Sequence, residues 1–176
     1  VYFHSVNGAV SVYDPAGDGS MADILLQGAV DEKAQLQLIA DDSVTTRVIA
    51  ADNADLLIRT TGREADTAEN DILVNQIFGT DVQVGLDSAG NILPLDTDTN
   101  LFVKLSGDVS LRMSATEDVG TLEHFVHIDV PCTVYVDNVT NFYADLNLRD
   151  TDGSQITPEI RDYAITQGYL TSDADA

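Results

Sequence analysis

The sequence predicts an all-β protein, an antiparallel β-sandwich or jelly roll of roughly 8–10 strands with one short C-terminal helix. Short apolar, β-rich runs recur along the chain at spacings of about 8–12 residues, with turn-forming residues between them. Several of these runs alternate apolar and polar side chains, which is typical of strands with one buried face. The 176 residues fit a single domain, expected over 1–170 and followed by an acidic flexible tail at 171–176.

The first 13 residues predict an N-terminal β-hairpin. Two β-rich runs, at 1–6 and 9–13, are joined by Asn7-Gly8. This dipeptide tolerates a positive φ at both central positions of a type I′ turn. A loop with three Pro or Gly residues follows at 14–20.

Further strand-like runs fill most of the chain up to residue 149. The clearest alternation, at 109–114, places Val109, Leu111 and Met113 on one face and polar residues on the other. The run at 142–149 alternates in the same way. No internal repeat is evident, which favours a single domain. The remaining predicted strands lie at 24–30, 34–40, 44–51, 56–60, 72–78, 82–86, 101–105, 122–130 and 132–136.

One helix is predicted near the end of the chain, over 157–168. Thr157 can cap its first turn, and Pro158 suits the first helical position. Glu159 favours the positive end of the helix dipole, and Gly168 can end the helix.

The charge of the chain predicts a surface adapted to concentrated salt. Thirty acidic residues face 8 basic ones, giving a net charge of −22, and only Lys33 and Lys104 are lysines. Such a chain repels itself at low ionic strength, whereas at 1 M salt the Debye length falls to about 3 Å. The composition resembles that of haloarchaeal proteins, and we expect monovalent cations at the acidic surface. An ordinary acidic protein is the alternative.

The same charge argues against two classes of partner. Eight scattered cations cannot form a basic patch, so no nucleic acid is expected as a partner. Adhesion to anionic lipid is equally disfavoured, and no apolar run approaches the ~20 residues of a membrane span. No signal peptide is visible, which predicts synthesis and assembly inside a cell.

No metal or cofactor site is predicted. His124 and His127 point to opposite faces of a regular strand, and His127 with Asp129 supplies only two ligands on one face. The Asp-rich loops 96–100 and 150–154 lack the Gly and Glu that an EF-hand calcium loop requires at its sixth and twelfth positions.

No catalytic residue is predicted either, so the chain is not expected to be an enzyme. Cys132 has no adjacent His and is expected to be a small core residue, and no nucleophile-elbow motif is present. A chance pair among 30 carboxylates carries no information about glycoside hydrolysis. The triplet beginning at Asn138 is an N-glycosylation sequon, which matters only if the chain meets a glycosylation machinery.

An all-β chain of this length and charge resembles the single jelly-roll major capsid proteins of tailless icosahedral haloarchaeal viruses with an internal membrane. In length it is similar to the smaller of their two capsid subunits. The resemblance implies a structural virion protein, assembled in the host cytoplasm as a homo-oligomer alongside a second, larger capsid subunit. The N-terminal hairpin and the acidic tail are then candidate arms that reach a neighbour.

Two other classes of function stay open. One is a decoration, turret or tail-tube protein of a tailed halophilic virus. The other is a cupin-like or carbohydrate-binding host β protein. The lack of Trp disfavours sugar binding, although the chain has six Tyr and five Phe.

Overall fold

The protein is all-β in the computed structural model, which describes residues 1–6, 8–12, 22–62 and 70–148. The helix predicted at 157–168 and the tail at 171–176 lie outside these residues. The described chain contains no helix. Its strands are β1 (Tyr2–Ser5), β2 (Val10–Val12), β3 (Ile24–Gln27), β4 (Ala34–Ala40), β5 (Val44–Thr60), β6 (Ile72–Ser88), β7 (Ile92–Leu93), β8 (Leu101–Ser106), β9 (Ser110–Ala115), β10 (Asp118–Val119), β11 (Val126–Val130), β12 (Val134–Asp137), β13 (Asn141–Phe142) and β14 (Ala144–Leu148).

The strands pair in parallel, which corrects the predicted antiparallel sandwich. Every pairing between named strands is parallel. The single antiparallel contact among the described residues is an isolated bridge between Ala29 and Glu32. The alternation of apolar and polar residues within a strand indicates which side of the strand is buried, but not whether the neighbouring strand runs parallel or antiparallel. Parallel and antiparallel sheets therefore look alike in this respect in sequence.

The pairings define a parallel β-solenoid, in which the chain winds in coils and each coil stacks on the one before it. The first face holds β1, β4, residues 54–60 of β5, residues 82–88 of β6, β9 and β12. The second holds β2, the starts of β5 and β6, β7, β10 and β13. The third holds β3, residues 49–52 of β5, residues 76–80 of β6, β8, β11 and β14.

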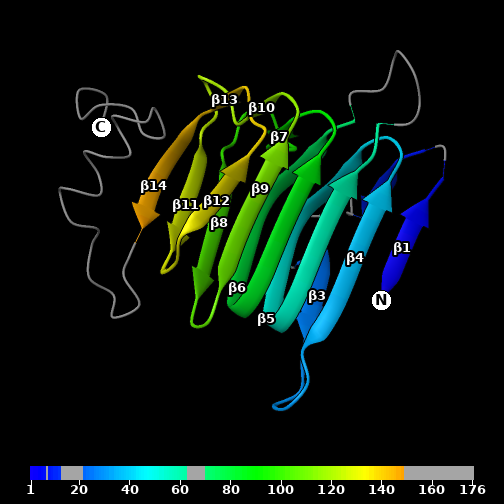
Figure 1. Cartoon of the computed structure of the whole chain (residues 1–176), viewed down its shortest axis with the longest axis vertical. Helices are drawn as coiled ribbons and strands as arrows, with labels where there is room; N and C mark the ends of the chain where they lie inside the picture. Colours follow the sequence, from blue (N-terminus) through cyan, green and yellow to red (C-terminus); the bar gives the residue numbers. More distant parts are fainter. Residues whose placement is uncertain (7, 13–21, 63–69, 149–176) are drawn as a thin grey trace.

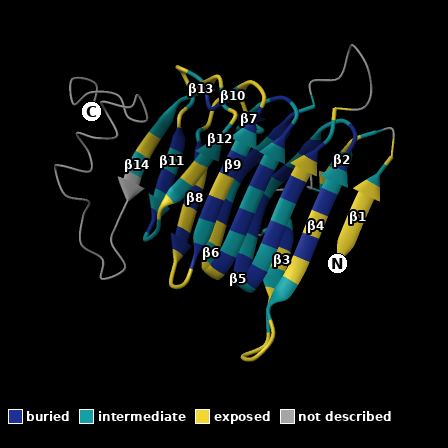
Figure 2. Ribbon diagram, viewed as in Figure 1, coloured by how far each residue is buried: buried dark blue, intermediate teal, exposed yellow. Residues whose placement is uncertain are grey.

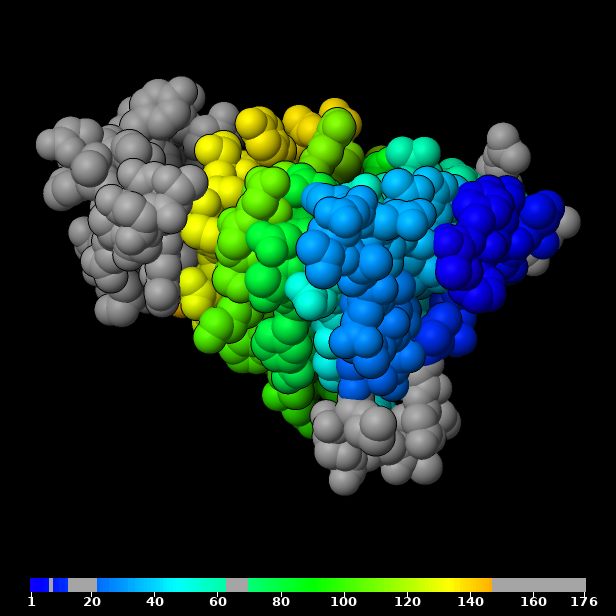
Figure 3. All heavy atoms as spheres, turned by 90° about the horizontal axis from the view of Figure 1, so that it is seen from below, coloured from blue at the N-terminus to red at the C-terminus, as the bar shows by residue number. Residues whose placement is uncertain are grey.

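Six coils follow one another along the solenoid axis (Figure 1). The first coil contains β1 to β3 and the last contains β12 to β14. Seen from below, the molecule changes colour from blue to yellow across its length, as expected when coils stack in chain order (Figure 3).

The predicted hairpin over 1–13 does not form. β1 pairs with β4, with Tyr2 opposite Gln37, and β2 pairs with β5, with Val10 opposite Val44. The strands β1 and β2 therefore lie on different faces of the solenoid instead of pairing with each other.

Alternating side chains point into the solenoid and form its core. On the first face Leu36, Leu56, Val84 and Leu111 occupy equivalent positions in successive coils, and all four are buried. Buried residues alternate visibly with intermediate or exposed residues along β4, β5 and β6 (Figure 2). Each such aliphatic side chain contributes roughly 1.5–3 kcal/mol by its burial. The alternation predicted at 109–114 is confirmed.

The corner between the third and first faces is built from stacked residues with positive φ. Asn53, Asp81 and Gly107 occupy it in three successive coils, with φ of 47°, 55° and 81°. The Oδ1 atom of Asp81 accepts a hydrogen bond from the backbone N–H of Asp108 at 2.7 Å. A Cβ added to Gly107 would lie 2.2 Å from that oxygen, so glycine is required at this position in the coil of Gly107.

The corner between the first and second faces carries a polar ladder, formed by residues at the start, or just before the start, of the second-face strands from β5 onward. Asp71 N–H donates to Ser43 Oγ at 3.2 Å, and Asn91 N–H donates to Asp71 Oδ1 at 2.6 Å. Asp118 N–H donates to Asn91 Oδ1 at 3.0 Å, and Asn141 N–H donates to Asp118 Oδ1 at 3.1 Å. Each side chain thus satisfies a backbone group of the next coil.

This ladder is an internal repeat, which corrects the expectation that the chain has none. In each of five coils a small polar residue precedes an apolar residue that points inward. The spacing between coils varies. Arg59 aligns with Asp87, 28 residues later, whereas Arg112 aligns with Tyr135, 23 residues later. A search for a fixed period therefore misses a repeat that the pairing reveals.

Candidate functional site

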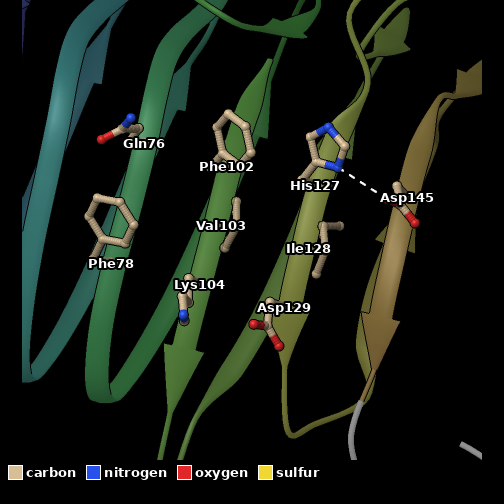
Figure 4. Close-up of a pocket in the computed structure, with 9 residues that line it drawn as sticks. All are labelled: Gln76, Phe78, Phe102, Val103, Lys104, His127, Ile128, Asp129 and Asp145. Carbon is tan, nitrogen blue, oxygen red and sulfur yellow. Dashed lines mark hydrogen bonds and ion pairs between the residues drawn. The ribbon is translucent and has the colours of Figure 1, made fainter. Parts of the chain in front are cut away.

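The outer surface of the third face carries a shallow groove of about 320 Å³ (Figure 4). It crosses β6, β8, β11 and β14, and therefore four successive coils. Two exposed phenylalanines give it an apolar part, and amide, ammonium, imidazole and carboxylate groups surround them. The lining residues are Gln76, Phe78, Phe102, Val103, Lys104, His127, Ile128, Asp129 and Asp145.

The parallel register arranges the outward side chains of the groove in two rows. Gln76 aligns with Phe102, and this row continues through His127 to Asp145. The second row contains Phe78, Lys104 and Asp129. Residues two apart on a strand share a face, so both rows project from the same side of the sheet (Figure 4). Equivalent positions on stacked coils thus become neighbours although they are far apart in sequence.

His127 is held in place from three sides. Its ring stacks on Phe102 with centroids 4.9 Å apart and an angle of 16° between the planes. Its Nδ1 lies 3.2 Å from Asp145 Oδ2, and its Nε2 lies 2.9 Å from the Nδ2 of Asn100. A neutral imidazole that donates from Nδ1 and accepts at Nε2 satisfies both neighbours. Both ring nitrogens therefore have partners within the protein. His127 helps to fix the shape of the groove and has no unoccupied ring nitrogen for a ligand.

The groove is chemically unlike the rest of the chain. Phe78 and Phe102 are 38% and 41% exposed, although aromatic rings of this size are usually buried. One of only two lysines, Lys104, lies here together with one of three histidines. They face the carboxylates of Asp129 and Asp145, so positive and negative groups are locally mixed in a chain whose net charge is −22.

The outer surface of the first face is polar and charged by contrast. Arg59 Nε lies 2.7 Å from Asp87 Oδ2, and Arg112 Nη2 lies 2.9 Å from Asp137 Oδ2. A depression on this face is lined by glutamine, serine and aliphatic residues and by Asp55 and Gly85, with no aromatic ring among them. This depression therefore has no aromatic lining, although Tyr135 is 59% exposed elsewhere on the first face.

The structure places some of the sequence-predicted residues together and separates others. His127 and Asp129 share one face, as predicted, and both line the groove. His124 belongs to a turn before β11, where its backbone oxygen accepts from Thr121 N–H at 2.8 Å. Cys132 packs against the core with partial exposure, and Asn138 is exposed at a positive φ.

The structure describes one of the two Asp-rich loops that were considered as calcium sites, the loop 96–100. Asp96, in the loop 96–100, receives the N–H of Asn75 Nδ2 at 2.5 Å and lies 4.0 Å from Arg47 Nε. This loop therefore contacts the two preceding coils at the corner between the second and third faces. The loop 150–154 lies outside the described residues.

Burial raises the pKa of the Cys132 thiol above its usual value, while a hydrogen bond with the backbone of Leu111 opposes this shift. The thiol is consequently protonated at neutral pH. Within residues 1–6, 8–12, 22–62 and 70–148, no three His, Cys, Asp or Glu side chains gather so that they could hold a metal ion. No helix in the described part of the chain is long and apolar enough to span a membrane.

Comparison of the chain with protein-family models, with curated proteins and with solved structures gave no match. Function must therefore be argued from the geometry of this molecule.

Sequence reasoning missed most of the groove. Phe78, Phe102 and Lys104 each lie in a strand that was predicted, but nothing local shows that they belong to adjacent coils. The polar ladder does not align the third-face strands by itself, because Phe102, His127 and Asp145 follow its members by unequal distances of 11, 9 and 4 residues. Only the strand register brings these three side chains into one row.

Proposed function

We propose that this chain is a structural protein that assembles end to end through the open strand edges of its first and last coils. One observation carries the proposal. Within the described residues, β1, β2 and β3 each pair along one side only, and so do β12, β13 and β14. Unpaired edges of a parallel sheet are templates for another strand.

The backbone directions at both ends suit this kind of pairing. Gln37 N–H donates to Val1 O at 3.0 Å and Asp41 N–H donates to Ser5 O at 3.2 Å. Because backbone groups alternate sides along a strand, those of Tyr2 point away from β4. At the other end, Tyr143 accepts from Val126 N–H at 2.9 Å, so the backbone groups of Ala144 point away from β11.

Joining the last coil of one copy to the first coil of the next would continue the solenoid. Such a head-to-tail contact uses two different surfaces and therefore extends into a linear assembly. The net charge of −22 opposes the contact in dilute buffer, and molar salt screens this repulsion. The proposal thus joins the acidic composition to the open edges in one mechanism, which is assembly rather than catalysis.

The virion of a halophilic archaeal virus is the setting that we propose, with the composition as its support. A capsid shell subunit of the jelly-roll type needs an antiparallel fold, and a parallel coil supports a different component. Among the virion alternatives, a decoration, turret or tail protein suits a rigid module that adds along one axis. A second virion protein remains the proposed hetero-partner of such a component.

The test is sedimentation of purified protein in about 3 M and about 0.1 M chloride, where the Debye lengths differ severalfold. We expect oligomers in high salt that dissociate in low salt. Tyr2→Pro removes an outward N–H while keeping the inner bonds of β1, and we expect it to shorten the oligomers. Tyr2→Ala is the matched control, because it removes the ring but keeps the N–H.

A mixing experiment defines the polarity of the contact. Ala144→Pro blocks the opposite edge, so each proline variant retains one open end. A mixture of the two variants is expected to give dimers and nothing larger. A wild-type chain that is monomeric at all salt concentrations, or oligomers that are unchanged in both proline variants, would overturn the proposal.

A further inference from the structure

We infer that the groove on the third face is a binding site for neutral saccharides. The inference rests on other observations than end-to-end assembly, because the groove lies on the outer surface of the third face, and of its lining residues Asp145 alone belongs to an end coil. It assigns a ligand class to a surface on which two exposed phenylalanine rings from adjacent strands meet hydrogen-bonding groups.

The aromatic rings supply the first argument. Phe78 and Phe102 come from adjacent strands of the same face and are both more than one-third exposed. A sugar ring has apolar C–H faces that pack on aromatic carbon, and hydroxyl groups around its edge that need polar partners. Phe102 is also fixed by its stacking on His127, so its orientation does not have to be ordered on binding.

The polar groups supply the second argument. Gln76 offers an amide donor and acceptor beside the rings, Lys104 offers an ammonium donor, and Asp145 offers carboxylate acceptors. Asp145 has 71% of its side chain exposed, so it can accept from hydroxyl groups while remaining beside His127. Donors and acceptors on both sides of an apolar centre match the edge of a sugar ring.

The charge supplies the third argument, which concerns the class of saccharide. An anionic glycan would approach a chain of net charge −22 and meet two carboxylates in the groove. A cationic ligand would meet Lys104 in the second row of the groove, and molar salt would screen its attraction to the carboxylates. Hydrogen bonds and apolar contacts to a neutral ligand persist in molar salt, whereas charge–charge attraction is screened. Neutral saccharides are therefore favoured.

The dimensions favour a short oligosaccharide. The groove crosses four strands, one from each of four successive coils. Neighbouring strands lie about 4.8 Å apart, so this row is about 14 Å long. A chain of a few sugar units could lie across the coils and contact both phenylalanine rings.

The test is saturation-transfer-difference NMR of the full chain in molar sodium chloride with neutral hexasaccharides of glucose, mannose, galactose and N-acetylglucosamine. A hexasaccharide of galacturonate serves as the anionic probe. We expect at least one neutral probe to bind, with its C–H protons saturated, and the galacturonate probe not to bind. Failure of all neutral probes, or binding of the galacturonate probe alone, would overturn the inference.

Two variants locate the contact. Phe102→Ala is expected to weaken binding about tenfold, because the variant loses both the aromatic contact and the burial of apolar area against the sugar. Tyr135→Ala is the control, because this ring is 59% exposed on the first face. Circular dichroism of both variants should match that of the wild type. Binding that is unchanged in Phe102→Ala, or lost equally in Tyr135→Ala, would place the ligand elsewhere.

A second copy of this chain is the competing occupant of the groove, and sedimentation separates the two. We expect Phe102→Ala to leave the oligomers unchanged, and the shortened Tyr2→Pro protein to bind saccharide as the wild type does. Oligomers that dissociate in Phe102→Ala would identify the groove as a contact between copies and overturn the saccharide assignment. Failure of assembly alone would leave saccharide binding intact.

Discussion

The first and third faces of the solenoid have the same interior and different exteriors. Leu56 and Leu111 are buried beneath the first face, and Ile77 and Ile128 are buried beneath the third. Outside, the first face carries Arg–Asp pairs, whereas the third carries the aromatic groove. The inward residues of each strand therefore determine the fold, and the outward residues are available for different chemistry on each face.

The largest expected effect tests whether the two interiors are equivalent. Met113→Ala beneath the first face and Ile77→Ala beneath the third both remove a fully buried side chain. Each should lower the free energy of unfolding by about 2–5 kcal/mol. Urea denaturation at one fixed high salt concentration measures both. A loss below about 1 kcal/mol for only one of them would show that the faces do not share one core.

The next largest effect on stability is expected for the polar ladder, which lies at the corner between the first and second faces. Asn91→Ala removes the acceptor of Asp118 N–H and donors to Asp71 and Glu117, and should cost about 1–3 kcal/mol. Asn141→Ala, at the last coil, removes only the bond from Nδ2 to Asp118 and should cost less. Equal losses in urea unfolding of the two variants would argue against a cooperative ladder.

Outward substitutions should separate stability from function. Arg112→Ala breaks an exposed ion pair on the first face, and such pairs contribute below about 1 kcal/mol. Phe102→Ala, on the third face, should also leave the unfolding midpoint within a few degrees while weakening saccharide binding. A large loss of thermal stability in Phe102→Ala alone would mean that its ring is structural.

The smallest effect concerns Cys132, which lies between the third-face strand β11 and the first-face strand β12. Its pKa is raised in the folded state, chiefly by burial. The protonated thiol is thus favoured by folding, and its contribution to stability is full below the ordinary thiol pKa of 9.0. The contribution is lost as the pH rises through the higher folded pKa.

Unfolding of the wild type and of Cys132→Ser, compared between neutral pH and pH values above the thiol pKa, measures this difference. The wild type should lose more stability than the variant as the pH rises. Alkylation of Cys132 should also be slower in the folded than in the unfolded chain. Equal alkylation rates would contradict the raised pKa.

Local sequence was enough to predict the all-β class and most strands. The predicted strand at 34–40 matches β4, and the alternation of Val109, Leu111 and Met113 matches their burial. The predicted strands at 44–51 and 56–60 proved to be parts of the single bent strand β5. Asn53, with its positive φ, lies at the bend between them, and no local pattern separates such a corner from a reversing turn.

The parallel pairing and the groove could not be predicted because both depend on partners in other coils. Asn7-Gly8 favours a hairpin locally, but β1 and β2 each pair in parallel with a strand of the next coil, bringing Val10 opposite Val44. The groove needs Phe102, His127 and Asp145 in one row, which only the coil register supplies. His127 and Asp129 were recognised as sharing a face because that relation lies within one strand.

Crosslinking across neighbouring coils tests the parallel register most directly. Thr80 and Ser106 are aligned on β6 and β8, with their hydroxyl oxygens 3.1 Å apart, and both are exposed. In a Cys132→Ser background, Thr80→Cys with Ser106→Cys should form an intramolecular disulfide readily under mild oxidation. Thr80→Cys with Lys104→Cys, two residues out of register on the same face, should form it poorly. Preferential crosslinking of the second pair, or none in the first, would contradict the parallel solenoid.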